Sequence, residues 1–177
     1  SESFMTDAHG RDHVTKIELA LDKDNNFLAF RTETMANVGA YLSNFSTVTP
    51  TILHGTLMAG NYAVPNVYVN VKTVFTNTAP VDAYRGAGRP EATYSLERVI
   101  DKAATELGLD PTNLRRQNFI KSDQFPYVTA AGLNYDVGDY DAVMDRLEHH
   151  ADLKGFAKRR KKSEAKGKLR GLGINSY

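Results

Sequence analysis

The chain has 177 residues, with 22 Lys or Arg against 21 Asp or Glu, so its overall charge gives no case for nucleic acid or an acidic membrane as a partner. Its length suits one domain with a real core rather than two. Because it contains no cysteine, these residues hold no disulfide, thiolate metal site, cysteine nucleophile or iron–sulfur ligand, and no apolar run is long enough for a membrane-spanning helix.

Four potential metal ligands lie near the start of the sequence, namely Asp7, His9, Asp12 and His13. Carboxylates and imidazoles suit zinc or non-haem iron in kind, but their spacing matches neither the H-E-x-x-H motif nor the facial triad. We therefore assign no metal site here and expect these side chains to cap turns.

The first regular element that the sequence predicts is a β-hairpin. Ile17, Leu19 and Leu21 alternate with polar residues, as in a strand with one buried face. Residues 22–26, DKDNN, have turn chemistry, and residues 27–35 form the returning strand, with Leu28 and Phe30 expected on one side.

A short helix over about Pro50–Met58 and a strand over Val67–Phe75 come next. His54 lies in the predicted helix, where a packed and hydrogen-bonded histidine is the more common reading and a general base is the alternative. The strand has the clearest alternation in the chain, and it leads toward a glycine-rich loop.

That loop is Asp82–Gly88, DAYRGAG, and it opens a helix. Gly86 and Gly88 permit backbone angles closed to other residues and let a ligand approach the main chain. Pro90 suits a first helical turn, and apolar residues recur at helical spacing as far as Leu107. From spacing alone two interpretations stay open: a tight turn with solvated arginines, or an anion site that uses Arg85.

Helices are also predicted after this one. Gly108 is a stop signal, and Asp110 with Pro111 restarts a short helix in which Leu114 faces inward while Arg115, Arg116 and Gln117 stay outside. After a polar loop, Asp139 caps a third helix whose apolar stripe is Tyr140, Val143, Met144 and Leu147. Its continuation carries KRRKKSEAKGKLR, residues 158–170, which we interpret as a solvated helix face, with a nucleic-acid patch as the alternative.

The fold class predicted from these elements is α/β (α+β): a mixed sheet with an N-terminal hairpin, a strand leading into a glycine-rich loop, and packed helices. Residues 169–177, LRGLGINSY, read like a strand just beginning, and the chain starts without methionine. We expect residues 1–177 to be a single piece of a longer polypeptide, in which catalytic groups from outside the chain complete the site. The lack of cysteine is compatible with a cytoplasmic protein.

The loop and its surroundings resemble a known family. Residues 79–120, APVDAYRGAGRPEATYSLERVIDKAATELGLDPTNLRRQNFI, are similar to the large subunits of the molybdenum hydroxylases, the family of xanthine dehydrogenase, aldehyde oxidase and aerobic carbon monoxide dehydrogenase. FMTDAHGRDH at residues 4–13, ANVGAYLS at 36–43 and NYAVPNVY at 61–68 resemble the same family, nearest to its carbon monoxide dehydrogenase branch. The resemblance covers essentially the whole chain.

The resemblance implies part of a molybdopterin-binding large subunit that oxidises an aldehyde or an N-heterocycle with water as the oxygen source. Its cofactor would be molybdenum on a molybdopterin dinucleotide, with FAD on a medium subunit and iron–sulfur clusters on a small subunit. Arg85 matches the arginine that lies beside the metal in this family, and Gly86, Ala87 and Gly88 match the adjoining wall of the pocket. Arg85 would orient ligands and stabilise charge, because a guanidinium keeps its proton.

Two positions depart from individual members of the family. Carbon monoxide dehydrogenases carry a copper-binding cysteine where this chain has Gly86, and xanthine dehydrogenases carry a stacking phenylalanine where it has Ala87. The glutamate base of the family has no match here. Carbon monoxide dehydrogenase and a non-catalytic interaction module remain the alternatives, and we expect the isolated piece to be catalytically inert.

Overall fold

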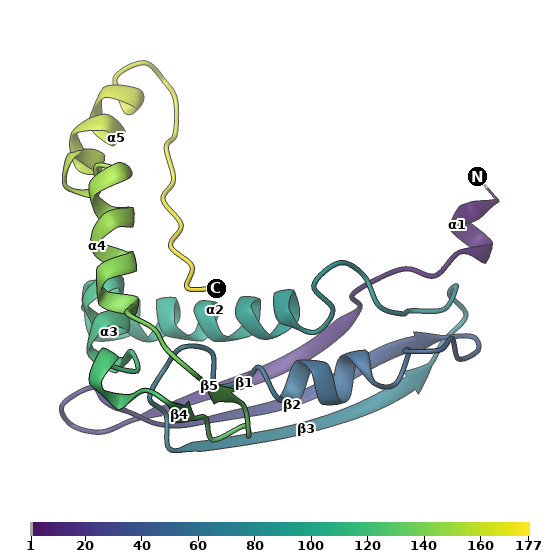
Figure 1. The fold of residues 1–177 in the computed structure, drawn as a ribbon. Coiled ribbons are helices and arrows are strands. Elements are labelled where there is room, and N and C mark those ends of the chain that lie inside the picture. The colour runs from purple at the N-terminus through teal and green to yellow at the C-terminus, as the bar shows by residue number, and fades with distance from the viewer. Residues whose placement is uncertain (1) are drawn as a thin grey trace.

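The structure, a computed structural model, describes residues 2–177. At its centre is a three-stranded sheet in the order β1, β2, β3, formed by His13–Leu21, Phe27–Gly39 and Asn66–Phe75 (Figure 1). β1 runs antiparallel to β2, and β2 runs parallel to β3. The mixed sheet, its N-terminal hairpin and the strand that precedes the glycine-rich loop are confirmed.

Asp22 closes the hairpin. Its Oδ1 accepts hydrogen bonds from the backbone N–H groups of Asp24 and Asn26, both at 2.8 Å. The register then shifts between Ala20 and Leu21. Near this irregularity the expectation for Leu28 was wrong: Leu28 is exposed, and the buried aromatic residues beside it are Phe27 and Phe30.

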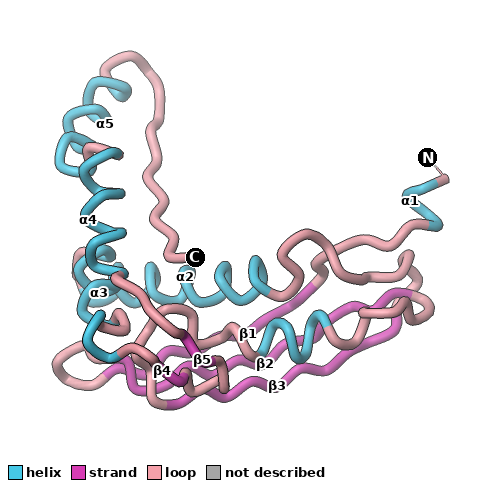
Figure 2. Tube along the Cα trace, viewed as in Figure 1, coloured by secondary structure: helices cyan, strands magenta, loops and turns pink. Residues whose placement is uncertain are grey.

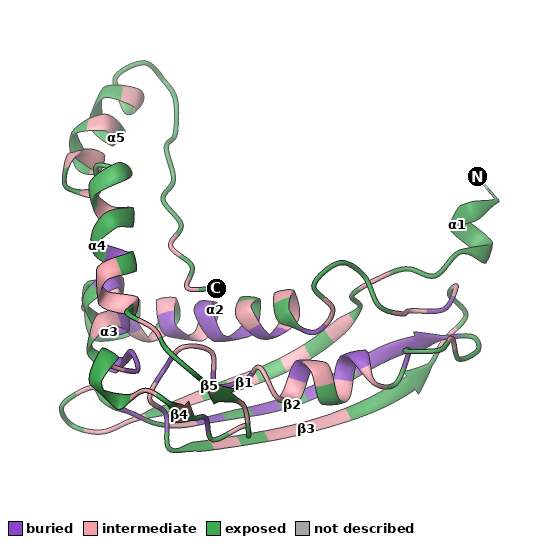
Figure 3. Ribbon diagram, viewed as in Figure 1, coloured by how far each residue is buried: buried purple, intermediate pink, exposed green. Residues whose placement is uncertain are grey.

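Helix α2, Arg89–Leu107, lies across one face of the sheet (Figure 1). Its apolar side joins β2 and the segment before β3 in one core, made of Phe27, Phe30, Met58, Ala59, Tyr62, Val64, Ala92, Leu96, Ile100, Ala104, Leu114, Phe119 and Met144. Residues of β2 that point the other way, such as Arg31 and Glu33, are exposed, so only one face of the sheet is covered (Figure 3).

Both predicted helix boundaries after the glycine-rich loop are confirmed. Gly108 ends α2 with a φ of 67°, a left-handed conformation that favours glycine. Asp110 then caps α3, Pro111–Asn118, because its carboxylate accepts from the backbone N–H groups of Thr112 and Asn113 at 2.9 Å.

The remaining elements are smaller. They are α1 (Ser3–Thr6), the π-helical turn η1 (Thr49–Leu53), the 3-10 turns η2 (Ser122–Gln124) and η3 (Leu153–Gly155), the short strands β4 (Tyr127–Val128) and β5 (Asn134–Tyr135), and the helices α4 (Tyr140–His150) and α5 (Phe156–Glu164). The helix predicted over about Pro50–Met58 is therefore shorter than expected, because helical structure ends at Gly55, and wider, because its first turn is π-helical.

The C-terminal third differs most from expectation. Asp139 caps α4 as predicted, but of the expected stripe only Met144 is buried, while Val143 and Leu147 are 65% and 47% exposed. Helix α5 is a separate helix after η3. The strand expected over residues 169–177 does not form: this segment is a loop that runs back beside α5 and α4 and ends at α2 (Figure 2).

Arg115 was wrongly expected outside, since it is fully buried. Its Nε donates to Glu97 Oε2 and its Nη2 to Asp101 Oδ1, both at 2.8 Å. Tyr62 donates its hydroxyl to the other oxygen of Glu97, at 2.5 Å. A charged residue is expected at the surface unless it has partners, and the sequence of α3 does not show that α2 places two carboxylates beside Arg115.

His54 is fully buried, as the packed interpretation requires, but within residues 2–177 neither of its ring nitrogens has a hydrogen-bond partner. Its ring meets the His13 ring edge-on, with centroids 5.5 Å apart. Burial, with a smaller contribution from the neighbouring His13, lowers the pKa of His54 to about 4, while the nearby backbone of Gly88 acts in the opposite direction. His54 is therefore neutral in the folded protein near pH 7.

Replacing Arg115 by Met should destabilise the fold strongly. The change leaves the Glu97 carboxylate buried without its cation, which costs about 3 to 5 kcal/mol. Denaturant unfolding of the full-length polypeptide measures the loss. Arg146→Met, at an exposed position of α4, is the matched control and should cost about 0.5 kcal/mol or less. Equal effects of the two variants would contradict a buried ion pair.

Acid should destabilise the protein through His54. Above the unfolded pKa of 6.5 the residue is neutral in both states, whereas between 6.5 and about 4 only the unfolded chain binds the proton. This difference removes about 2 kcal/mol of stability between about pH 7.5 and about pH 5. His54→Leu should flatten this part of the stability profile, and His149→Leu, at an exposed position, should not. Unfolding midpoints across the pH range provide the comparison.

Candidate functional site

The glycine-rich loop, residues 82–88, connects the end of the sheet to α2. Its first residue is held from two sides: Asp82 donates its N–H to the His9 carbonyl at 2.7 Å, and its Oδ2 accepts from the Phe45 N–H at 3.3 Å. His9 also forms a parallel bridge with Val81. The segment before β1 and the segment after β2 therefore fix where the loop begins.

The two glycines of the loop serve different purposes. Gly88 has a φ of +83°, and a Cβ there would lie 2.4 Å from the carbonyl carbon of Leu53, so the backbone packs directly on the turn that carries His54. Gly86 has a φ of +79°, but a Cβ there would meet only ordinary contacts. Gly88 is buried and Gly86 is exposed. Of these two glycines, Gly86 is the one at the protein surface.

The backbone of this loop offers unused donors. None of the five consecutive N–H groups of residues 84–88 donates to an acceptor within residues 2–177; the first that does is the N–H of Arg89, to the Gly86 carbonyl at 2.9 Å. Successive free N–H groups at a bend before a helix suit the oxygens of an anion.

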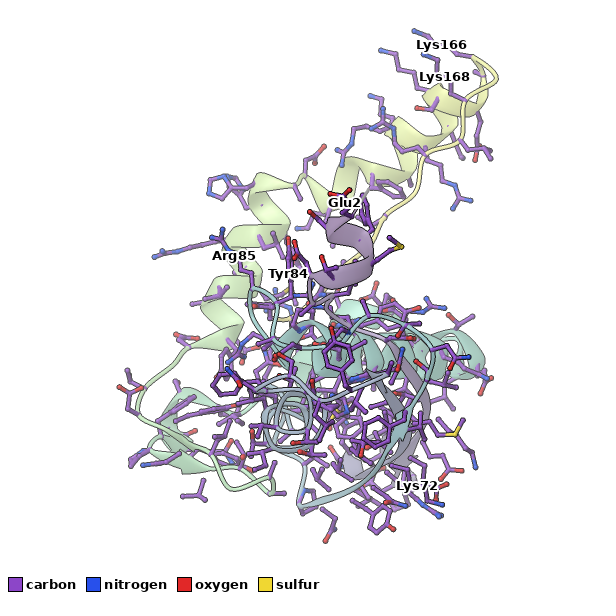
Figure 4. The ribbon with its side chains drawn as sticks, turned by 90° about the vertical axis from the view of Figure 1, so that its right-hand side faces the viewer. Glu2, Lys72, Tyr84, Arg85, Lys166 and Lys168 are labelled. Carbon is purple, nitrogen blue, oxygen red and sulfur yellow. The ribbon has the colours of Figure 1, made fainter. Side chains whose placement is uncertain are left out.

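Arg85 and Tyr84 lie next to each other on the outside of the loop and are both exposed (Figure 4). Within residues 2–177, Arg85 has no acidic partner within ion-pair distance. Its carbonyl accepts a hydrogen bond from Arg11, whose guanidinium lies 4.9 Å from the centroid of the Tyr84 ring. The Arg85 guanidinium is thus available to a ligand that approaches from the solvent side.

A cavity of about 690 Å³ lies below the loop, between β1 and α2. It is lined by Arg11, His13, Val14, Thr15, Ile17, Pro90, Glu91, Tyr94, Ser95 and Arg98, so Arg85 is outside it. The Glu91 side chain is only 7% exposed; Arg11 lies 3.8 Å from its Oε1, and its Oε2 has no partner within residues 2–177. Sequence reasoning missed Glu91, although a carboxylate directly after Pro90 in a first helical turn was the available signal.

His13 connects this cavity to the core. Burial lowers its pKa, while the carboxylates of Glu91 and Asp12 act in the opposite direction and reduce the shift. Together with His54 it forms a polar layer beneath the glycine-rich loop. The backbone of His54 lies against Gly88, so the two histidines pack under the end of the loop.

The four potential ligands near the N-terminus do not converge. His9 Nε2 lies 3.1 Å from the Phe4 carbonyl, and Asp12 accepts from the Asn37 side chain at 2.8 Å. Among residues 2–177, no group of three His, Cys, Asp or Glu side chains is arranged to hold a metal ion. Only the His9 bond is local: Asp12 bonds to a residue of β2, and His13 Nδ1 has no hydrogen-bond partner within residues 2–177, so the turn-capping interpretation does not hold for these two side chains.

The basic residues 158–170 lie on and beyond α5, with Lys166 and Lys168 at its far end (Figure 4). α5 buries no residue, which agrees with a solvated helix face. Arg160 pairs with Glu164 one turn away. Across the part of the chain that the structure describes, no helix is long and apolar enough to cross a membrane.

Comparison with known proteins identifies the family. Residues 1–119 match the model of the molybdopterin cofactor-binding domain. The 6-hydroxypseudooxynicotine dehydrogenase complex subunit gamma of Paenarthrobacter nicotinovorans is 32% identical over 98% of this chain and 22% of its own length. The carbon monoxide dehydrogenase large chain of Hydrogenophaga pseudoflava is 35% identical over 82% of this chain and 18% of its own.

Solved structures agree. Quinoline 2-oxidoreductase from Pseudomonas putida 86 superposes with a TM-score of 0.86 at 30% identity, over 94% of this chain and 21% of that chain. A Cu,Mo-CO dehydrogenase superposes with a TM-score of 0.78 at 33% identity, over the same share of this chain.

The chain spans about a fifth of the length of these relatives. The family match covers the hairpin, β3, the glycine-rich loop and α2, which are the elements that build and hold the loop. By this match and by its identity to the relatives, the chain belongs to the molybdopterin cofactor-binding domain family.

Proposed function

We propose that this chain is a single piece, residues 1–177, of the molybdopterin-binding domain of a molybdenum hydroxylase large subunit, which oxidises an aldehyde or an N-heterocycle with water as the oxygen source. The observation that carries this proposal is the loop of residues 82–88, with five free N–H groups and an exposed guanidinium, in a chain of this family. We also propose that the protein is cytoplasmic.

The loop fits the cofactor that the family implies. A molybdopterin dinucleotide presents phosphate and metal-bound oxygens, which suit backbone donors and a permanent cation. Arg85, Gly86, Ala87 and Gly88 are the residues that we propose to contact it. When bound, the cofactor supplies the two-electron oxidation that inserts an oxygen atom from water into a carbon–hydrogen bond of the substrate.

We assign Arg85 an electrostatic role. Its guanidinium is exposed beside Gly86 and stays protonated, so it orients an oxygen of the ligand and stabilises negative charge that develops during the reaction. Gly88 has a different role, since its contact with the backbone of Leu53 fixes the height of the loop above the core. The wall near the substrate is then formed by Gly86 and Ala87, which leave room for it.

Carbon monoxide dehydrogenase is the second candidate, because relatives with that name are up to 35% identical to this chain. Against it, the chain contains no cysteine, so a copper held by a cysteine of this loop has no ligand here. Oxidation of CO by the full complex would favour this candidate. As partners we propose an FAD-binding medium subunit and an iron–sulfur small subunit, since a relative of this chain is itself a subunit of a dehydrogenase complex.

Metal analysis tests the proposed function. The full-length subunit, purified with its partners, should contain about one molybdenum and one pterin per large subunit. Elemental analysis together with fluorescence of the oxidised pterin measures both. A complex with intact subunits and neither component would show that the chain is a non-catalytic module.

Replacing Arg85 by Ala in that complex should lower kcat by about 100-fold or more, because a charge-stabilising donor is lost from the site. Molybdenum content and thermal stability should stay unchanged, since the side chain is exposed and makes no ion pair within residues 2–177. Arg146→Ala is the control for removing an exposed arginine. Normal turnover of the Arg85 variant would remove this residue from the site.

A further inference from the structure

The segment just before β1 runs beside the glycine-rich loop and contacts it at Gly10 and Arg11. A Cβ at Gly10 would lie 2.5 Å from the Cβ of Tyr84, so the backbone here packs directly against a side chain of the loop. Arg11 has a φ of 64°, a left-handed conformation that is uncommon for a residue with a side chain. Such a conformation persists where the surrounding contacts determine it, and the Arg11 side chain makes contacts of that kind.

The guanidinium of Arg11 contacts both the loop and the helix that follows it. Its Nη2 donates a hydrogen bond to the carbonyl oxygen of Arg85, and the guanidinium lies 4.9 Å from the centroid of the Tyr84 ring. Its Nε lies 3.8 Å from Oε1 of Glu91, which is in the first turn of α2. Because the Glu91 side chain is only 7% exposed, water screens this attraction weakly. One side chain thus connects the middle of the loop to the start of α2.

The hydrogen bond from Arg11 determines which way one of the free N–H groups of the loop points. The carbonyl of Arg85 and the N–H of Gly86 belong to the same peptide unit, and this unit is trans. The two groups of a trans peptide point in opposite directions, so the Gly86 N–H points away from Arg11. Glycine adopts positive and negative φ about equally well, so without the hydrogen bond this peptide unit is free to turn over and reverse both groups.

We propose that Arg11 is a positioning residue of the site at the glycine-rich loop. It holds the peptide unit between Arg85 and Gly86 in the orientation in which the Gly86 N–H is free to donate to an anionic oxygen of the cofactor. The inference rests on the proposed function and adds to its site a residue that acts through the backbone of the loop. Arginine suits this role because its planar fork of donors serves a carbonyl and a carboxylate at the same time.

The variant Arg11→Lys separates positioning from charge compensation. Lysine keeps a cation near Glu91, so the buried carboxylate is not left alone, but its single ammonium group does not reproduce the fork that serves both acceptors. Arg98→Lys is the matched control. Arg98 lines the same cavity and makes no side-chain hydrogen bond or ion pair within residues 2–177.

The test measures amide hydrogen exchange over residues 84–88 in the full-length subunit with its partners. The bound cofactor should protect these N–H groups in the parent, and their exchange in Arg11→Lys should be about tenfold faster. We expect kcat to fall about tenfold and KM to change less than about twofold, because the donors are misaligned while the substrate pocket is kept. The thermal midpoint should stay within about 3 °C of the parent, and Arg98→Lys should match the parent throughout.

A double variant decides the case in which Arg11→Lys does not assemble. Arg11→Met combined with Glu91→Gln removes both charges, leaves no buried carboxylate without its cation, and should show the same faster exchange and lower kcat. The inference requires both changes. It is overturned if the exchange or the kcat of the variant that assembles equals that of the parent, or if Arg98→Lys shows the same losses.

Failure of the proposed function gives a different result. A complex without molybdenum and pterin fails that proposal, and the exchange measurement is then made on the cofactor-free full-length protein with inorganic pyrophosphate as the anion. Pyrophosphate should slow the exchange of residues 84–88 in the parent and in Arg98→Lys, and should slow it less in Arg11→Lys. If it protects these residues in none of the proteins, or equally in the parent and Arg11→Lys, the inference about Arg11 is overturned.

Discussion

The ion pair between Glu97 and Arg115 joins four separate parts of this chain. Both oxygens of Glu97 are used: one accepts from Tyr62, and the other accepts from Arg115 and from the backbone of Ser176. Removing a carboxylate and a guanidinium from water is costly, and only this complete set of hydrogen bonds offsets it. The pair is therefore less a source of stability than a constraint on which segments meet, because an arrangement that omits any partner leaves a buried charge unsatisfied.

The glycine-rich loop depends on that constraint at one end and on packing at the other. α2 is fixed along its length by the core and by Glu97, and its first turn follows Gly88, whose backbone lies against Leu53 and His54. At the other end of the loop, its first residue Asp82 is held by hydrogen bonds with the backbones of His9 and Phe45. A loop so restrained holds its free N–H groups in place, so that a ligand meets donors that need little reorganisation.

Local sequence patterns predicted much of this architecture. Alternation along residues 17–35 and 67–75, the turn at Asp22, the stop at Gly108 and the cap at Asp110 each depend on neighbours within a few residues, so their signals are complete in the sequence. The prediction that Val143 and Leu147 are buried was wrong. An apolar stripe predicts a surface to pack against, but α4 extends beyond the core formed within residues 2–177. The resemblance pointed to Arg85 and Gly86 as site residues, while spacing alone left the loop undecided.

By itself the sequence determined the elements of the sheet, the position of the glycine-rich loop between a strand and a helix, and the family. The tertiary structure decided which charges are buried, as for Arg115, which of two similar glycines is required for packing, and which distant side chain, Arg11, contacts the loop. The physical reason is distance along the chain. Glu97 lies 18 residues before Arg115, and Leu53 lies far before Gly88, so neither contact leaves a periodic pattern in the sequence of either partner.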